Sequence, residues 1–388
     1  MSKLKVMTIL GTRPEIIRLA RVMALLDTTT DHTIVHTGQN WDYELNEVFF
    51  SDLSVRQPDY FLGVDTSSLG AVLGGILIET EKAINTVKPD AVLILGDTNS
   101  AISAIIARRM KIPVYHMEAG NRSFDRNVPE ETNRRLVDHA SDFNLVYTEH
   151  ARRHLLSEGI EHRRIYLTGS PMKEVLTYYR SKIHDSKILD QLSLEKNNYF
   201  IASIHREENV DNPARLKSLL DTLNSLAEQH ECPVIISTHP RTRKRLNGLS
   251  GPQLHENLQF LKPFGFYDYN HLQMYARCAI SDSGTIAEES SILGFPAITP
   301  RDAIERPEAI DTGAIIFTGV TMNNMLQGID LAVKLFEQNH KRGEEVNLPN
   351  DYDISNTSER VVKLICGSAK LSNDWDGIRG DLSVAERN

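Results

Sequence analysis

The sequence predicts an α/β protein made of two Rossmann-like domains with a deep cleft between them. Short apolar runs such as AVLIL at 91–95 are typical of strands buried in a parallel sheet. These runs alternate with segments of helical length, which indicates β-α-β crossovers. The alternation starts twice along the chain, and a length of 388 residues favours two domains over one.

The first series of elements occupies residues 5–168. Strands are expected at 5–10, 33–36, 91–95, 113–116, 143–147 and 164–168, and helices at 16–26, 43–53, 71–86, 101–110, 131–139 and 150–159. We assign this series to an N-terminal domain of residues 1–170 and expect helices on both faces of its parallel sheet.

The second series follows a pause at GSP, 169–171, and a charged helix expected at 173–192. Strands are expected at 199–204, 233–237, 258–261, 278–281, 297–299 and 314–317, and helices at 213–230, 242–246, 267–276, 286–293 and 321–336. This series defines a C-terminal domain of residues 171–370, followed by a polar tail at 371–388. The amphipathic helix expected at 355–367 has an apolar face that can cross back onto the first domain.

The composition narrows the class of partner. A formal net charge of -9 and a pI near 5.9 argue against nucleic acid and anionic membranes, which select basic surfaces, and favour a small molecule or another subunit. The sequence shows no long apolar segment and no leader, so we expect a cytoplasmic enzyme. Cys232, Cys278 and Cys366 lack metal-ligand spacing and are interpreted as small core residues, so no metal site is predicted.

Three acids follow expected strands or open the next helix of the first domain. Asp97 lies in GDTNS (96–100) after one strand, Glu118 lies in HMEAG (116–120) after the next, and Glu130 lies in PEETNR (129–134). Because the carboxyl ends of parallel strands meet at one edge of a sheet, we expect the three carboxyl groups to gather there.

The first strand is followed by GTRPE, 11–15. A dinucleotide-binding domain would carry Gly-x-Gly-x-x-Gly here, and its absence argues against a tightly held NAD. Pro14 pre-sets the start of a helix, and Arg13 directs a fixed cation toward the cleft. A plain capped turn is the alternative interpretation of this segment.

The second domain has a comparable segment, SDSGTIAEE at 281–289, between a strand and a helix. Small residues let backbone N-H groups approach a phosphate at the helix N-terminus, and Ser283 and Thr285 add hydroxyls. A carboxylate at Glu288 or Glu289 can accept both hydroxyls of a ribose. An ordinary helix N-cap with Glu in its first turn is the alternative.

SIHREEN at 203–209 ends another strand of this domain. His205 stands there at a sheet edge, where it can bind a phosphate or transfer a proton, and Arg206 favours an anion site. A structural histidine, and an Arg206 paired with Glu207 or Glu208, are the alternatives. The segment THPR, 238–241, likewise places a histidine and an arginine after the next expected strand.

Taken together, these segments resemble the non-hydrolysing UDP-N-acetylglucosamine 2-epimerase family, which is related to the GT-B glycosyltransferases. The resemblance covers roughly residues 4–365 and rests on GTRPE (11–15), GDT (96–98), EAG (118–120), PEETNR (129–134), HRE (205–207), DSG (282–284) with EE (288–289), and ERPE (305–308). Each motif alone is unspecific, whereas the ordered set at strand ends is highly specific.

The resemblance implies a role for each matching residue. The catalytic group would be Asp97, Glu118, Glu130 and His205. UDP would be held by Arg13, Ser283, Gly284, Thr285 and Glu289, with Arg134 and Arg306 lining the same cleft. No cofactor and no metal are implied, and relatives suggest a homodimer.

The family inverts C2 of the sugar by losing UDP to form a 2-acetamidoglycal and then adding UDP back. C2-H beside an acetamide nitrogen is a very weak acid, so the leaving group must depart early and leave an oxocarbenium-like sugar that carboxylates stabilise. A base on one face and an acid on the other are then needed, and we expect crowding of the three acids to separate their pKa values. We expect His205 and Arg13 to stabilise the departing diphosphate and the domains to close over the intermediate.

Two departures from the common pattern bear on the substrate. Arg18 stands where the common enzymes carry Lys in the first helix. The run 39–41 reads Gln-Asn-Trp where regulated members read Gln-His-Arg, so their allosteric second sugar-nucleotide site is not expected to be kept.

Three further segments, at 39–47, 118–122 and 237–243, are similar to a branch that makes UDP-N-acetyl-L-fucosamine. That branch epimerises C2 of UDP-2-acetamido-2,6-dideoxy-L-talose for capsule and O-antigen. A UDP-N-acetylglucosamine 2-epimerase is the alternative within the family.

Two other classes of protein compete with an epimerase. A GT-B glycosyltransferase has the same fold, but it has no need for three acids together with His205. A non-catalytic nucleotide-sugar sensor gains nothing from burying like charges. The acid cluster therefore favours the epimerase.

Overall fold

The computed structural model describes residues 3–38, 43–125, 127–246, 254–303, 305–343 and 348–378. The chain forms two compact units, each with its own parallel sheet. Unit 1 comprises Met1–Val175 and Ile354–Asn388, and unit 2 comprises Leu176–Asp353. The predicted pair of α/β domains with parallel sheets is confirmed.

Unit 1 has a seven-stranded sheet in the order β3-β2-β1-β4-β5-β6-β7. Its strands are β1 (Lys5–Leu10), β2 (Asp31–His36), β3 (Tyr60–Phe61), β4 (Ala91–Leu95), β5 (Val114–Met117), β6 (Phe143–Val146) and β7 (Ile165–Leu167). Its helices are α1 (Arg13–Thr29), α2 (Tyr43–Asp52), α3 (Leu69–Val87), α4 (Ser103–Arg109), α5 (Pro129–Ala140), α6 (Glu149–Ser157), α17 (Thr357–Ser368) and α18 (Ser372–Trp375), and α7 (Met172–Tyr178) leads into unit 2.

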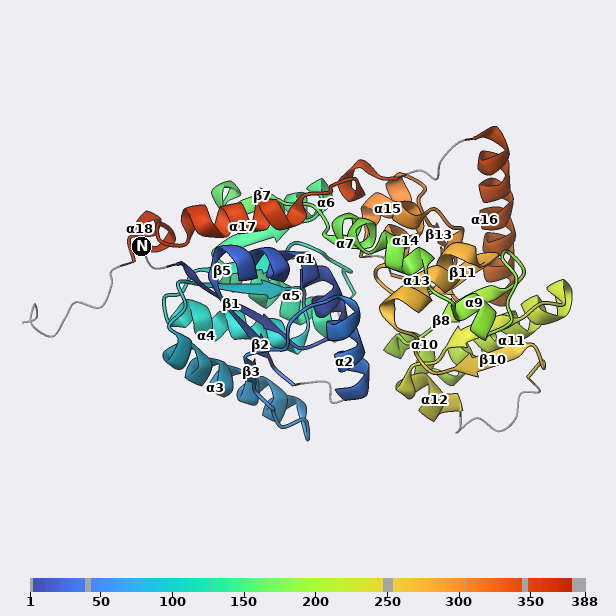
Figure 1. Cartoon of the computed structure of the whole chain (residues 1–388), viewed down its shortest axis with the longest axis horizontal. Coiled ribbons are helices and arrows are strands. Elements are labelled where there is room, and N and C mark those ends of the chain that lie inside the picture. Colours follow the sequence, from blue (N-terminus) through green and yellow to red (C-terminus); the bar gives the residue numbers. More distant parts are fainter. Residues whose placement is uncertain are drawn as a thin grey trace, which may run out of the picture. The chain divides into compact units, whose positions relative to one another are not determined.

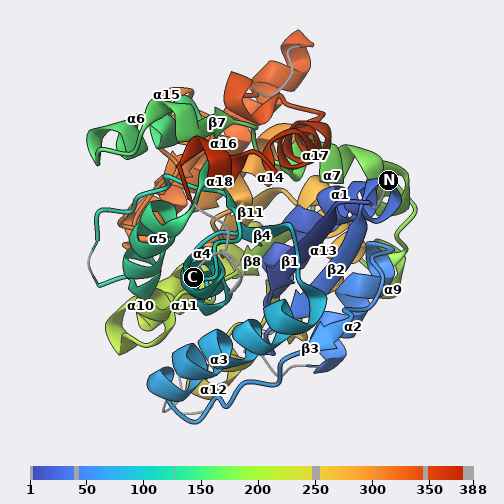
Figure 2. The ribbon, with the colours of Figure 1, turned by 90° about the vertical axis from the view of Figure 1, so that its left-hand side faces the viewer.

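Helices cover both faces of the unit 1 sheet. Helix α1 packs against α2 and α17, and α3 packs against α4. Figure 1 shows α1 and α17 on one side of the strands and α3 with α4 on the other. The turned view in Figure 2 also separates α17 from α3 by strands β1 and β2. Every residue of β4 is buried, as its continuous apolar run predicts.

Unit 2 has a six-stranded sheet in the order β10-β9-β8-β11-β12-β13. Its strands are β8 (Phe200–Ser203), β9 (Val234–Ser237), β10 (Leu258–Leu261), β11 (Cys278–Ser281), β12 (Ala297–Thr299) and β13 (Ile316–Phe317). Its helices are α8 (Arg180–His184), α9 (Ile188–Gln191), α10 (Glu207–Val210), α11 (Pro213–His230), α12 (Pro240–Leu246), α13 (Phe266–Tyr275), α14 (Ile286–Leu293), α15 (Pro307–Asp311) and α16 (Met322–Arg342). Both units therefore repeat the strand order 3-2-1-4-5-6 of Rossmann-like sheets, unit 1 with one strand more.

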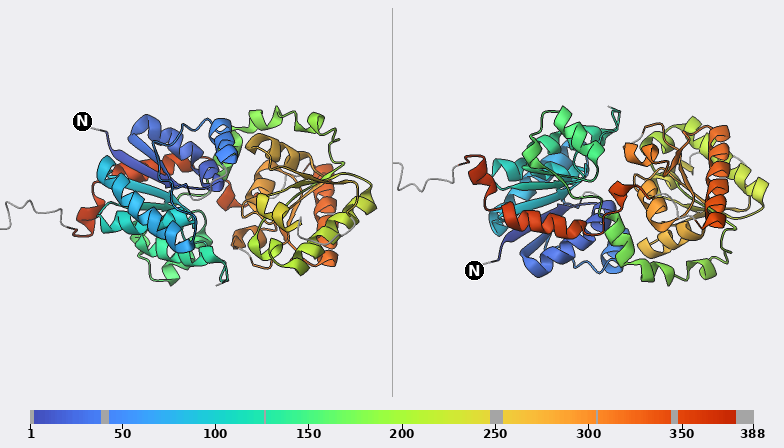
Figure 3. Two further views of the ribbon diagram at one scale, coloured as in Figure 1. Left: turned by 90° about the horizontal axis from the view of Figure 1, so that it is seen from below. Right: turned by 90° about the horizontal axis from the view of Figure 1, so that it is seen from above.

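The division into units differs from the expected boundary at residue 370, because α17 packs on α1 of unit 1. Tyr115 on β5 and Ser368 at the end of α17 share a hydroxyl hydrogen bond of 2.7 Å. The hydroxyl of Thr357, at the other end of the helix, donates to the carbonyl of Ser170 at 3.0 Å. Both views in Figure 3 show the red helix α17 on the unit that contains the blue N-terminal strand.

Two smaller expectations were wrong. The helix expected at 173–192 is divided into α7, α8 and α9, and between the last two the hydroxyl of Ser186 accepts the backbone N-H of Ile188, which replaces a helical bond. Cys232 and Cys278 are buried as expected, but Cys366 lies on the exposed face of α17. The short strand β3 was not predicted, because two residues carry no alternation.

Within the described ranges, none of the helices is both long enough and apolar enough to cross a membrane. The same residues contain no group of three His, Cys, Asp or Glu side chains placed to hold a metal ion.

Candidate active site

The predicted site residues follow the strands at the switch point of each sheet. In unit 1, β1 and β4 are neighbours; Arg13 begins the helix after β1, and Asp97 lies in the loop after β4. In unit 2, β8 and β11 are neighbours, and the loops after them contain His205 and Ser283. Ligands of open α/β sheets bind at the carboxyl ends of strands on either side of such a switch point.

Asp97 is held by a buried arginine. The Nε of Arg134 donates to Asp97 Oδ2 at 3.0 Å, and its Nη2 bonds the same oxygen. The amide of Asn133 donates to the Asp97 carbonyl at 3.0 Å. The Asp97 side chain keeps 28% of its surface exposed, so this carboxylate has a fixed direction and an open side.

Glu118 follows β5 in the left-handed region, with φ 64°, a conformation that a non-glycine residue keeps only when its surroundings impose it. The guanidinium of Arg18 pairs with Oε2, and the amide of Asn121 donates to Oε1 at 3.2 Å. A Cβ at Gly96 would lie 3.6 Å from Glu118 Oε2, which places this carboxylate beside the residue that precedes Asp97.

The buried arginines change the expected electrostatics of the cluster. The acids were expected to separate their pKa values by mutual repulsion, but Asp97 and Glu118 each face a guanidinium instead. Arg134 was expected to line the cleft, and the sequence left open whether Arg18 touches the substrate; both side chains are buried in these ion pairs. Their first effect is to fix the two carboxylates in place.

Glu130 and Glu131 both lie in the first turn of α5, where the helix dipole favours negative charge. Glu130 is half-buried. Glu131 is buried, and its Oε2 accepts the backbone N-H and the hydroxyl of Ser123, each at 3.0 Å. It also pairs with Arg134 at 3.2 Å, so Glu131 supports the arginine that holds Asp97.

Glu15 was not predicted as a site residue, yet it joins the two loops of the unit 1 switch point. Its Oε2 accepts the N-H of Gly11 at 3.1 Å and the hydroxyl of Thr12 at 2.7 Å, and its Oε1 lies 3.2 Å from the hydroxyl of Thr98. Burial raises the pKa of Glu15 to about 7, against the lowering effect of these hydrogen bonds. The neighbouring Arg13 places its guanidinium 5.6 Å from the ring centre of Phe49.

His205 forms a dyad with Asp282 in unit 2. Its Nδ1 lies 3.1 Å from Asp282 Oδ1, and 38% of its side chain is exposed. Asp282 is fully buried and also accepts the backbone N-H groups of His205 and Arg206 at 3.0–3.1 Å and the amide of Asn209 at 3.0 Å. Burial alone would raise the pKa of Asp282, but the facing His205 and these donors lower it to about 2.

An ionised Asp282 has a direct consequence for His205. The carboxylate orients the ring through Nδ1 and leaves Nε2 as the nitrogen available to a ligand. His205 is therefore oriented as a proton donor or acceptor, which favours the functional interpretation over the structural one.

The loop after β11 forms a chain of hydroxyl contacts. The hydroxyls of Ser283 and Thr285 lie 2.9 Å apart, and Thr285 donates to Glu289 Oε1 at 2.6 Å. The amide of Gln273 donates to Glu289 Oε2 at 2.9 Å. Glu289 is half-exposed at the start of α14, as a ribose-binding carboxylate needs to be.

Glu288 and Arg306 are both buried, although Glu288 was a candidate ribose ligand and Arg306 was expected to line the cleft. Glu288 is fully buried, and the Nη2 of Arg306 lies 3.4 Å from its carboxylate. The Nε of Arg306 donates to the carbonyl of Gly284 at 2.9 Å. Arg306 was expected to line the cleft, but it is buried and supports the Gly284 loop from behind. Of the two candidate carboxylates, exposure selects Glu289.

Arg206, in the loop after β8, lies beside the Gly284 loop. Its guanidinium is 3.5 Å from Glu305, and a Cβ at Gly284 would lie 3.6 Å from its Nη2. Glu305 also accepts Arg301 at 3.0 Å. Arg206 thus places a cation beside Gly284, where the sequence predicts a diphosphate.

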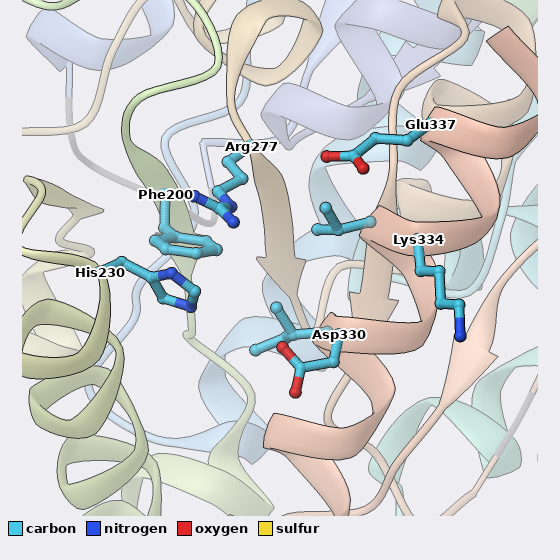
Figure 4. Close-up of a pocket in the computed structure, with 8 residues that line it drawn as sticks. Phe200, His230, Arg277, Asp330, Lys334 and Glu337 are labelled. Atoms are coloured by element: carbon cyan, nitrogen blue, oxygen red, sulfur yellow. The ribbon is translucent and has the colours of Figure 1, made fainter. Parts of the chain in front are cut away.

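A separate pocket in unit 2 contains none of the predicted site residues. Its volume is about 150 Å³, and Figure 4 shows Phe200, His230 and Arg277 facing side chains of α16 across it. Phe200 begins β8 and Arg277 precedes β11, so this pocket lies at the amino ends of the strands, away from the predicted site.

Three residues that were not predicted as site residues hold predicted ones or their loops in place. Asp282 lies in the DSG motif, Glu15 in GTRPE and Glu131 next to Glu130, so their positions within these motifs could have indicated them. The run at 39–41, used to question an allosteric site, lies outside the described residues.

The fold and site define a two-unit α/β enzyme with carboxylates and a histidine at the ends of its parallel strands. The model of the family described as UDP-N-acetylglucosamine 2-epimerase matches residues 24–366. The chain belongs to this family and is an isomerase of the epimerase type.

Individual relatives agree over nearly the whole chain. A structure of UDP-N-acetylglucosamine 2-epimerase from Rickettsia bellii is 44% identical, covers 97% of this chain and 100% of its own, and has a TM-score of 0.90. The Methanocaldococcus jannaschii enzyme in complex with UDP-GlcNAc and UDP is 34% identical over 94% of this chain and 100% of its own, with a TM-score of 0.85. The UDP-2,3-diacetamido-2,3-dideoxy-D-glucuronate 2-epimerase of Pseudomonas aeruginosa is 32% identical, covering 84% of this chain and 91% of its own.

Proposed function

We propose that this enzyme inverts C2 of a UDP-2-acetamido sugar by eliminating UDP to a 2-acetamidoglycal and adding it back. The observation that carries the proposal is the pair of carboxylates, Asp97 and Glu118, each fixed by a buried arginine at the ends of adjacent strands. Family membership supports the reaction class.

The roles follow from the chemistry of the site. The C1-O bond to the diphosphate breaks first, and the oxocarbenium-like sugar is stabilised by carboxylate charge. A carboxylate among Asp97, Glu118 and Glu130 then takes the C2 proton, and a protonated group on the other face returns a proton when UDP is added back. His205, oriented by ionised Asp282, stabilises the departing diphosphate together with Arg206, which lies beside Gly284.

The nucleotide would be held by the loop after β11. Ser283, Gly284 and Thr285 open α14 and offer hydroxyls and backbone N-H groups to phosphate. Glu289 would accept the ribose hydroxyls, because Thr285 and Gln273 already fix its carboxylate.

For the sugar itself we propose UDP-2-acetamido-2,6-dideoxy-L-talose, converted to UDP-N-acetyl-L-fucosamine for capsule or O-antigen synthesis by a cytoplasmic homodimer. The support is the similarity of segments 118–122 and 237–243 to that branch. A relative that acts on a diacetamido glucuronate shows that family membership leaves the sugar open. Conversion of UDP-N-acetylglucosamine to UDP-N-acetylmannosamine is the alternative.

Incubation with each UDP-sugar in deuterated water tests the reaction. Epimerisation predicts deuterium at C2 of the product without any acceptor, whereas a requirement for an acceptor would indicate a glycosyltransferase. Faster turnover of UDP-N-acetylglucosamine than of the L-talose derivative would refute the proposed sugar.

Amide variants test the acids. Asp97→Asn, Glu118→Gln and Glu130→Gln should each lower kcat by at least about 10²-fold while UDP binding, measured by calorimetry, changes little. Asp125→Asn is the matched control, because this carboxylate lies between Glu118 and Glu130 in the chain and accepts the backbone N-H and the side-chain amide of Asn127 in its own loop. Loss of UDP binding in the three variants would mean that the acids are structural.

A further inference from the structure

A buried histidine in unit 1 touches both loops that carry Asp97 and Glu118. His116 lies on β5, two residues before Glu118, and none of its surface is exposed. Its Nε2 is 2.7 Å from the carbonyl oxygen of Gly96, the residue before Asp97. Its Nδ1 is 2.9 Å from Asp138 Oδ1 on α5.

The atoms around the ring determine where its protons are. A carbonyl oxygen only accepts, so Nε2 must carry a hydrogen. The Nδ1 contact with Asp138 Oδ1 is an ion-pair contact and not a well-aligned hydrogen bond. The bond to the Gly96 carbonyl thus fixes one hydrogen of the ring, on Nε2.

Asp138 is held in place by its other contacts. Arg122 Nη1 donates to Asp138 Oδ2 at 2.7 Å, and the backbone N-H of Gly120 lies 3.2 Å from the same oxygen. Arg122 is buried and also binds Glu158, the residue after α6, with two hydrogen bonds of 2.9 and 2.6 Å. On the strands beside β5, the register partners of His116 are Ile94 and Asn144, neither of which is charged.

The two contacts of His116 bridge the loops after β4 and β5. Gly96 and Gly120 both have positive φ, 73° and 79°, and lie immediately before Asp97 and two residues after Glu118. The Gly120 side is closely packed, since a Cβ there would lie 2.4 Å from the carbonyl oxygen of Ala151. Gly96 has no comparable packing, because its nearest neighbour would be Glu118 Oε2 at 3.6 Å.

We propose that His116 is a positioning residue that sets the separation of Asp97 and Glu118, by holding the Gly96 carbonyl with a proton on Nε2 while Asp138 anchors Nδ1. This inference rests on the proposed function for Asp97 and Glu118. It assigns to His116 no contact with substrate. A shift of about 1 Å in a reacting group is enough to lower a rate about 10²-fold.

Two amide variants separate the two contacts. His116→Gln places an amide N-H near the position of Nε2 and keeps the bond to Gly96, whereas His116→Asn places it near Nδ1 and keeps only the Asp138 side. We expect kcat to fall about 10²-fold in His116→Asn and less than about 10-fold in His116→Gln, with KM for the UDP-sugar within about 3-fold of wild type in both. His139→Gln, which removes an exposed histidine from the same helix as Asp138, is the control and should not change kcat.

The position of the ring hydrogen is tested on the wild-type enzyme without any turnover. Long-range ¹H-¹⁵N spectra, assigned by loss of the signals in His116→Gln, should show a hydrogen on Nε2. A ring without a hydrogen on Nε2, equal kcat in the Asn and Gln variants, or an effect confined to KM would each overturn the proposal. If no UDP-sugar exchanges deuterium at C2, the proposed function fails, while the spectra still decide whether Nε2 of His116 donates to the loop of Gly96.

Discussion

Glu15 of unit 1 and Asp282 of unit 2 are buried carboxyl groups that each join the two loops of a switch point, in sheets with the same strand order. Their pKa values nevertheless move in opposite directions: burial raises that of Glu15 to about 7, while the facing His205 and its neighbouring donors lower that of Asp282 to about 2 despite burial. Burial is common to both groups, so it does not decide the charge.

The difference lies in the donors. Asp282 faces an imidazole, which attracts the carboxylate when it is protonated, and it also faces two backbone N-H groups and an amide N-H, which only donate. Glu15 faces one backbone N-H and two hydroxyls, and a hydroxyl can accept from a protonated carboxyl as readily as it donates. Unit 2 therefore keeps a permanent charge beside His205, and unit 1 keeps a carboxyl that changes charge near neutral pH beside Asp97.

The largest effect is expected from Asp282→Asn. The amide leaves His205 without its orienting charge. We therefore expect kcat to fall by about 10²- to 10⁴-fold, which is the range that acid-base groups and the residues orienting them contribute to a rate. Because the folded pKa lies below the unfolded value of 3.8, the carboxylate stabilises the fold above that value, and this stability is lost as the pH falls toward 2. Asp302→Asn, at an exposed carboxylate paired with Arg215, is the control and should leave kcat unchanged.

Glu15→Gln also replaces a carboxyl group with an amide. In contrast to Asp282, the ionised form of Glu15 destabilises the folded enzyme, so this replacement should stabilise it at high pH. The folded form keeps its proton up to about pH 7 and the unfolded form loses it near 4.5, so the free energy of unfolding of the wild type should fall as pH rises between these values. The amide imitates the protonated carboxyl at every pH. At pH 8 the variant should be more stable by up to about 3 kcal/mol, and at pH 4.5 nearly equal, in guanidinium unfolding. Equal stability at pH 8 would show that Glu15 is ionised without cost.

The smallest effect is expected from removing a single donor. Thr12→Val removes the hydroxyl that bonds Glu15 Oε2 at 2.7 Å, and this bond lowers the pKa of Glu15. The pH at which Glu15 titrates should therefore rise, with a loss of about 1 kcal/mol in unfolding free energy at pH 8. Unfolding measured as a function of pH gives both the pH at which Glu15 titrates and the change in unfolding free energy. If Glu15 titrates at a lower pH in Thr12→Val than in the wild type, the hydrogen bond assigned to Thr12 is contradicted.

Much of the site could be predicted because its residues stand at strand ends, and strand ends are visible as the limits of apolar runs. Asp97, Glu118, His205 and Ser283 all follow such runs, and the topology brings them to the switch points. The order of the motifs also identified the family, which the comparisons confirm.

Side-chain pairing could not be predicted, because it depends on contacts between residues that lie far apart in the sequence. Nothing local indicates that Arg18 would pair with Glu118, or that Glu288 would be buried on Arg306 while Glu289 stayed accessible. The same limit applies to α17, whose attachment to unit 1 rests on partners such as Tyr115, distant in sequence.

The attachment of α17 makes unit 2 an insertion within unit 1, since residues before 176 and after 353 belong together. During synthesis, unit 2 is complete on the ribosome while unit 1 still lacks the helix that covers α1. Unit 1, which begins first, is therefore the last to be finished, and the carboxylates of its acid cluster lie in the part of the enzyme that matures latest.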